Sequence, residues 1–222
     1  MTTSATAAPG CFLQASDGSD NYTTMAEVTN IGGASLTRET VDVTYHGGTW
    51  GEHIATNPDA GELSIDINWL PANATQTQME TDLVGTARNY RICFNNYGAS
   101  TATFTTDYGT DDRLDITHGM LTGEPFRVTT TTALPAGLAI DTTYYAKVVD
   151  ADEITVHTTS AGAVAGTGAV ELTDDGTGTQ TAQKVTTWIL PGLITALTPA
   201  GPVDGKLAAT ATFKVTGAPT FD

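Results

Sequence analysis

The 222-residue sequence has few basic residues, few cysteines and no long apolar run. Nine Lys and Arg stand against 25 Asp and Glu, giving a net charge of −16. This argues against a nucleic-acid clamp or an anionic lipid-binding surface, because both need clustered cations. Cys11 and Cys93 do not make a disulfide scaffold, and no CxxC pair is present for zinc. The most apolar stretch, 188–197, is half a membrane span and contains Pro191 and Gly192, so no membrane anchor is expected.

The first ten residues lack the basic and apolar regions of a signal peptide, which favours synthesis in a cytosol. Residues 1–20 are small and polar and are expected to form a flexible arm. Cys93 lies in a strand-like run, where a reduced structural thiol is the simplest interpretation.

Motifs for catalysis are missing as well. The four histidines are scattered, and no HExxH, GxSxG or GxxxxGK[ST] occurs, so we expect no enzyme, catalytic residue, metal ligand or cofactor. His157 sits in a strand pattern and is expected at the surface. Acidic residues cluster at 111–112, 150–153 and 174–175. Solvated hairpin turns are the simplest interpretation, and calcium binding by these turns stays open.

What the sequence does contain favours β-structure. It has 44 Thr with many Gly and Val, a composition typical of pleated strands and turns. Residues 40–45 and 62–69 alternate in polarity, placing Val41, Val43 and Tyr45 on one face and Leu63, Ile65, Ile67 and Trp69 on another. One helix is expected over 71–85, with a capping box at Thr75 and Gln78 or at Thr77 and Glu80. Met79 and Leu83 would share its apolar face.

The composition shifts near residue 100. Residues 104–183 hold 12 acids and 3 bases, with turn signals about every ten residues, which predicts a small β-sandwich. We interpret this segment as a domain inserted into a body formed by residues 1–103 and 184–222. Such an insert is expected to decorate the outside of any assembly.

Four stretches of the body resemble the major tail tube protein of lambda-like, long-tailed bacteriophages. They are Glu27-Val-Thr-Asn-Ile31 with Leu36-Thr-Arg-Glu-Thr-Val-Asp-Val-Thr-Tyr45, Glu62 to Trp69 with the following helix, Arg88-Asn-Tyr-Arg-Ile-Cys-Phe94, and Pro202-Val-Asp-Gly-Lys-Leu207 with Phe213-Lys-Val-Thr-Gly217. The insert carries the patterns GLAxxTTYYxxVVDA at 137–151 and LTDDGTGT at 172–179. Through them it is similar to a small domain within phage tail proteins, although lambda's own tube protein carries its extra domain at the C-terminus.

The resemblance implies an all-β fold with one short helix: a β-sandwich or half-barrel tail-tube fold carrying the inserted small β-sandwich. It also implies homo-hexameric rings, joined by sheet edges and stacked into a hollow tube through which phage DNA passes during ejection without specific binding. The implied partners are the tape measure protein, the tail terminator and tail-tip proteins. The implied location is the tail of the virion, assembled in the host bacterial cytoplasm.

Within this interpretation, the segment from Tyr45 to Gly61 is expected to be a loop that stacks one ring on the next. It combines glycines with large side chains, and its candidate residues are Tyr45, His46, Trp50, Glu52, His53 and Ile54. Strand alternation points Asp42, Glu62 and Asp66 away from the core. These three are the candidate acids of a negatively charged lumen. Arg91 and Lys214 are expected to face outward too, where they could pair with acids.

Two other functions stay open. Tyr144, Tyr145 and the acidic turns would suit a surface-displayed β-sandwich adhesin or a carbohydrate-binding module, which predicts a stable monomer. A secreted ring related in fold to the type VI secretion tube predicts rings without long tubes.

Overall fold

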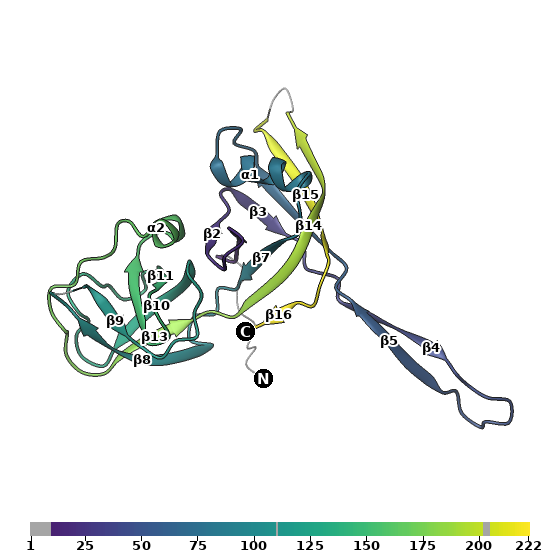
Figure 1. Ribbon diagram of the computed structural model, residues 1–222, viewed down its shortest axis with the longest axis horizontal. Coiled ribbons are helices and arrows are strands. Elements are labelled where there is room, and N and C mark those ends of the chain that lie inside the picture. Colours follow the sequence, from purple (N-terminus) through teal and green to yellow (C-terminus); the bar gives the residue numbers. More distant parts are fainter. Residues whose placement is uncertain (1–9, 110, 202–204) are drawn as a thin grey trace. The chain divides into compact units, whose positions relative to one another are not determined.

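The computed structural model describes residues 10–109, 111–201 and 205–222 (Figure 1). Strands dominate, which confirms the predicted all-β class. The chain divides into two compact units, each built from separate segments. The first comprises Met1–Ala26, Arg88–Ile189 and Thr220–Asp222, and the second comprises Glu27–Ala87 and Leu190–Pro219. Strand β14 (Thr187–Ala200) begins in the first unit and continues in the second.

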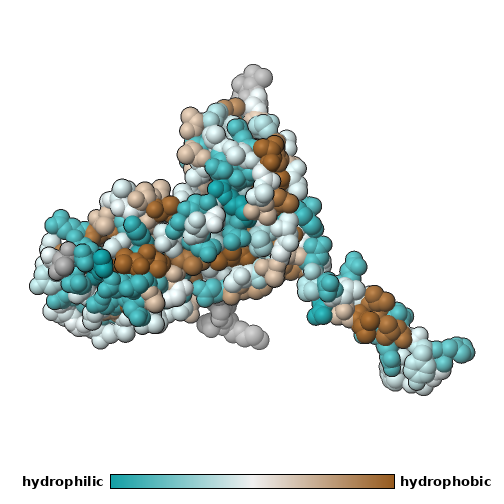
Figure 2. Space-filling model, viewed as in Figure 1, coloured by the Kyte–Doolittle hydropathy of each residue, from teal (hydrophilic) through white to brown (hydrophobic). Residues whose placement is uncertain are grey.

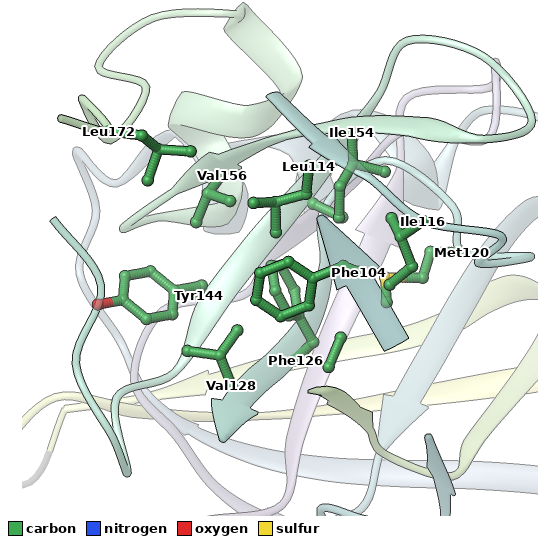
Figure 3. Close-up of a cluster of buried hydrophobic side chains, with 12 residues drawn as sticks. Phe104, Leu114, Ile116, Met120, Phe126, Val128, Tyr144, Ile154, Val156 and Leu172 are labelled. Atoms are coloured by element: carbon green, nitrogen blue, oxygen red, sulfur yellow. The ribbon is translucent and has the colours of Figure 1, made fainter. Parts of the chain in front are cut away.

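Six strands of the first unit close into an antiparallel barrel in the order β10-β11-β12-β9-β8-β13. They are β8 (Ser100–Asp107), β9 (Arg113–Asp115), β10 (Glu124–Thr130), β11 (Tyr144–Val148), β12 (Glu153–His157) and β13 (Gln180–Lys184). Inward side chains fill a barrel of this size, so it has a core and no channel. Figure 3 shows the larger buried side chains converging: Phe104, Leu114, Ile116, Met120, Phe126, Val128, Tyr144, Ile154, Val156 and Leu172. Ala146 and Ala182 belong to the same buried cluster. The segment expected as a sandwich is thus a closed barrel.

A short helix, α2 (Ser160–Ala165), follows β12 and was not predicted. The Thr159 hydroxyl caps its N-terminus by accepting a 3.0 Å hydrogen bond from the Gly162 N–H. Gly166 ends it with a φ of 68°, a left-handed conformation that glycine adopts without strain. Local capping therefore explains where this helix begins and ends.

Three further strands of the first unit form an antiparallel ladder with β1 (Phe12–Ser16) between β2 (Tyr22–Thr24) and β7 (Arg88–Cys93). The expectation of a flexible arm is therefore wrong for residues 12–16, while residues 1–9 lie outside the described residues. Strand β16 (Thr220–Phe221) pairs with the start of β14. There the Trp188 ring meets Phe94 and Phe221 edge-on, at centroid distances of 5.4 and 5.0 Å.

The second unit is built on strands ordered β14-β15-β6-β3, which include β3 (Val28–Ile31), β6 (Glu62–Asn68) and β15 (Ala208–Val215). The alternation predicted for β6 is confirmed for Leu63, Ile65 and Ile67, which are buried. Phe213 of β15, opposite Leu63, is buried with them. Trp69, also expected inward, is only half-buried. Of the resembling stretches, residues 202–204 lie outside the described residues.

The predicted helix forms as α1 (Ala74–Leu83), but its cap differs from the prediction. Neither capping box is used, because Asn73 is the N-cap and its Oδ1 accepts a 3.0 Å hydrogen bond from the Thr75 N–H. Met79 is buried, whereas Leu83 is 42% exposed, so the expected apolar pair is only half correct.

The division into a body of residues 1–103 and 184–222 and an insert of residues 104–183 stays a prediction. The barrel strands run from Ser100 to Lys184, close to those bounds. The barrel, however, belongs to the same compact unit as β1, β2 and β7.

Candidate assembly surfaces

The residues expected for ring stacking lie on a β-hairpin (Figure 1). Strands β4 (Thr37–Asp42) and β5 (His53–Asp59) pair antiparallel, with Val41 opposite Ile54. The expectation of a loop from Tyr45 to Gly61 is wrong for residues 53–59, which are strand. His53 and Ile54 begin β5, and the connection 43–52 carries Tyr45, His46, Trp50 and Glu52.

No residue of the two strands is buried. All of β4 is exposed, and Thr56 alone in β5 is half-buried. The alternation of Val41, Val43 and Tyr45 therefore does not face a core, and Trp50 at the tip is 84% exposed. Figure 2 shows the resulting hydrophobic patch on the hairpin. Because an isolated two-stranded hairpin is marginally stable in water, this surface is suited to contact with another chain.

The hairpin tip is held by its own hydrogen bonds. The Val43 N–H donates to the Glu52 carbonyl at 2.8 Å, and the Glu52 N–H donates to the Thr44 hydroxyl at 2.8 Å. Asp42 Oδ1 accepts from both the hydroxyl and the N–H of Thr44. These bonds favour the charged carboxylate and hold the Asp42 pKa below its usual value.

Two of the three candidate lumen acids share a strand. Glu62 and Asp66 lie on β6 at even spacing, on the face opposite the buried leucine and isoleucines. Asp66 accepts from the Thr210 hydroxyl at 2.8 Å and from Asn30 Nδ2 at 3.1 Å, and these bonds lower its pKa. Asp42 lies on the hairpin strand β4 and is not on this face. The structure therefore groups Glu62 with Asp66 and leaves Asp42 apart.

The two bases expected to face outward differ in their surroundings. Lys214 lies opposite Glu62 in the ladder, yet its Nζ contacts Asp59 at 3.3 Å. The Asp59 pKa is lowered, first by the Gly61 N–H and then by Lys214. Arg91 is fully buried, so the expectation for it is wrong. Because Lys214 contacts Asp59 instead of Glu62, the exposed Glu62 remains a solvated acid.

Carboxylates of the acidic turns accept hydrogen bonds from nearby backbone N–H groups or form ion pairs. Asp150 Oδ1 accepts from the Asp152 N–H at 2.8 Å, and Asp174 Oδ1 accepts from the Gly176 N–H at 2.9 Å. Glu153 pairs with Arg113 at 2.6 Å. Among the described residues, no group of three or more His, Cys, Asp and Glu is placed to hold a metal ion.

The tyrosines proposed for a carbohydrate site are not presented as an exposed pair. Tyr144 is buried in the barrel, where its hydroxyl accepts a 2.9 Å bond from the Ala139 N–H. Tyr145 is half-buried, and burial raises its pKa. No observation therefore favours the carbohydrate-binding alternative.

Two other expectations concern single side chains. His157 is buried, which corrects its expected surface position, and its ring nitrogens contact the Thr167 carbonyl and the Thr155 hydroxyl at 3.0 Å. Cys93 is a buried free thiol as expected, and burial raises its pKa to about 12. A thiol of this kind is unreactive near neutral pH.

Sequence patterns missed a buried polar cluster of Gln14, Arg91 and Glu124. Arg91 alternates with Tyr90 and Ile92, a pattern that predicts a solvated side chain, and Gln14 lies in the segment expected to be a flexible arm. No signal in the sequence distinguishes an outward face from one that another part of the chain covers.

Comparison with known proteins supports the resemblance. Residues 11–116 match the family described as "Lambda phage tail tube protein, TTP". Among solved structures, the chain is similar to one titled "Cryo-EM structure of the anti-feeding prophage (AFP) baseplate, 6-fold symmetrised", with 11% identity and a TM-score of 0.48, covering 100% of this chain and 97% of that one. A comparison with curated proteins found no match. Among the described residues, none of the helices has the length and hydropathy of a membrane span.

Proposed function

We propose that this chain is the subunit of a phage tail tube, because its residues 11–116 match the lambda phage tail tube protein family. Six copies form a ring, rings stack into a hollow tube, and the tube conducts DNA during ejection. The family match is the observation that carries this proposal, and the unpartnered hairpin supports it.

The hairpin supplies the contact between rings in this proposal. Its exposed Val41, Tyr45, Trp50 and Ile54 would be covered by a copy in the next ring. Such a contact joins two different surfaces of the same chain, and head-to-tail contacts that do not close generate open filaments. A tube of stacked rings needs this kind of interface.

A negatively charged lumen would allow DNA to pass without binding. A lining that neutralised phosphates would release counterions and bind the DNA, which would slow its movement. We place Glu62 and Asp66 on the lumen side, because they lie on the face of β6 opposite its buried side chains and, among the described residues, no base forms an ion pair with them. Asp42 belongs to the hairpin and would lie near the contact between rings. The lumen is therefore net negative in this proposal.

The family also suggests the remaining partners. Tape measure protein would occupy the tube during assembly, and the terminator and tail-tip proteins would contact its two ends. The subunit would be made in the cytoplasm of the host bacterium and end in the virion tail.

Negative-stain electron microscopy of the purified protein, with size-exclusion chromatography, tests the proposal directly. We expect rings of six and tubes built from them. A stable monomer at all concentrations would contradict the tube and favour a binding module, and rings that never elongate would favour a secreted ring.

A further inference from the structure

Arg91 is a fully buried cation whose contacts come from several elements of the first unit. Its Nε donates to Gln14 Oε1 at 2.8 Å, and its Nη1 contacts Glu124 Oε2 at 3.3 Å. The guanidinium also lies over the Tyr22 ring, 4.1 Å from its centroid. Glu124 begins barrel strand β10, whereas the other three residues belong to β1, β2 and β7. Arg91 therefore joins the barrel to the β2-β1-β7 ladder.

Hydrogen bonds that involve backbone groups also join the β2-β1-β7 ladder to its neighbours. Gln14 Nε2 donates to the Gly123 carbonyl at 2.7 Å, and the Tyr22 N–H donates to the Thr122 carbonyl at 2.9 Å. Further along the same edge of β2, the Thr24 N–H donates to Ser160 Oγ at 2.8 Å. The ladder is thus bonded both to the turn before β10 and to helix α2.

Gly123 fits this interface closely. Its φ is +84°, and a Cβ at this position would overlap the Tyr22 carbonyl oxygen. Gly109, two residues after β8, has nearly the same φ of +83°, but no atom of the described residues lies within 4 Å of its Cβ position. The two glycines differ in proximity to the ladder and not in backbone conformation.

We infer that the barrel and the β2-β1-β7 ladder fold and unfold as one cooperative unit, held by an interlock of Gln14, Tyr22, Arg91, Gly123 and Glu124. A buried charge without its partner is strongly unfavourable, so neither half keeps its structure at this interface when the other opens. Lys184 of β13 extends the network, with its Nζ 3.9 Å from Glu124 and 3.4 Å from Asp222.

The interlock gives the inserted segment a role in the stability of the subunit that is separate from tube assembly. A domain on a flexible tether could be replaced by a linker without affecting the body. The interlock makes the barrel a structural part of the subunit, because its removal would expose Arg91 and Gln14.

Hydrogen exchange measured by mass spectrometry on full-length Gly123→Ala and Gly109→Ala variants tests the interlock. We expect Gly123→Ala to accelerate exchange of peptides from β7 and from β10 by the same factor, about tenfold or more, and Gly109→Ala to have a much smaller effect. Acceleration confined to one of the two strands, or equal effects of the two substitutions, would overturn the inference.

Should Gly123→Ala fail to fold, the unmodified protein provides the second measurement. Its exchange is followed in increasing urea, below the unfolding transition. Equal opening free energies for β7 and β10 would support one cooperative unit, whereas opening of the barrel while β7 stays protected would contradict it.

Discussion

Val41 on β4 lies directly opposite Ile54 on β5, and the two side chains remain 49% and 58% exposed. A cross-strand apolar pair normally stabilises a sheet by packing against further residues. Here no described residue covers it, so its stabilising effect awaits a second chain.

We predict that Ile54→Ser abolishes tube formation and leaves the subunit folded. The substitution removes apolar area from the proposed ring contact, yet an exposed position changes the free energy of unfolding by only about 0.5 kcal/mol. Electron microscopy and thermal unfolding measure the two effects. Ile140→Ser is the matched control, since Ile140 is 57% exposed on the other unit. Normal tubes from Ile54→Ser would exclude this contact.

We predict that Glu62→Lys permits assembly but slows DNA ejection, and that added salt restores the rate. The introduced cation would bind phosphates in the lumen, and salt weakens such binding. Ejection from reconstituted phage at two salt concentrations is the measurement. Glu171→Lys makes the same charge change at an exposed position in the connection between α2 and β13 and should have no effect. An unchanged rate for Glu62→Lys would place Glu62 outside the lumen.

We predict that Arg91→Met destabilises the subunit by about 3–5 kcal/mol, because it leaves Glu124 buried without its main partner. Burial raises the Glu124 pKa, although Arg91 opposes this. The double variant Arg91→Met/Glu124→Gln should recover much of the loss, since the uncompensated charge is gone. Urea unfolding of both variants and of Glu124→Gln completes the cycle. Additive effects would mean that the pair does not interact.

We predict that His157 makes the first unit less stable in mild acid. Burial lowers the pKa of His157 from 6.5, so the unfolded chain binds this proton more readily than the folded one. The free energy of unfolding should therefore fall as the pH drops below about 6.5, and level off below the folded-state pKa. His157→Asn should flatten this part of the profile in urea titrations at several pH values. A slope unchanged by the substitution would assign it to other groups.

The sequence alone predicted those elements whose pattern of apolar and polar residues agrees with their burial in the structure. Leu63, Ile65 and Ile67 alternate and are buried, and the helix near residue 75 forms with a polar cap. The acids Glu62 and Asp66 could be assigned to the outer face of β6 for the same reason: a strand of period two has two faces, and the apolar one is covered.

Only the tertiary structure decided what covers a given face. Val41, Val43 and Tyr45 alternate as well as β6 does, yet they stay exposed because no described part of the chain packs on the hairpin. Arg91 has the pattern of a solvated residue, yet it is fully buried against Glu124, 33 positions away. Alternation is a property of the local backbone, whereas burial depends on contacts between residues distant in sequence. The sequence by itself therefore determined the strands and their two faces, and the packing of distant segments determined which faces are core, interlock or open surface.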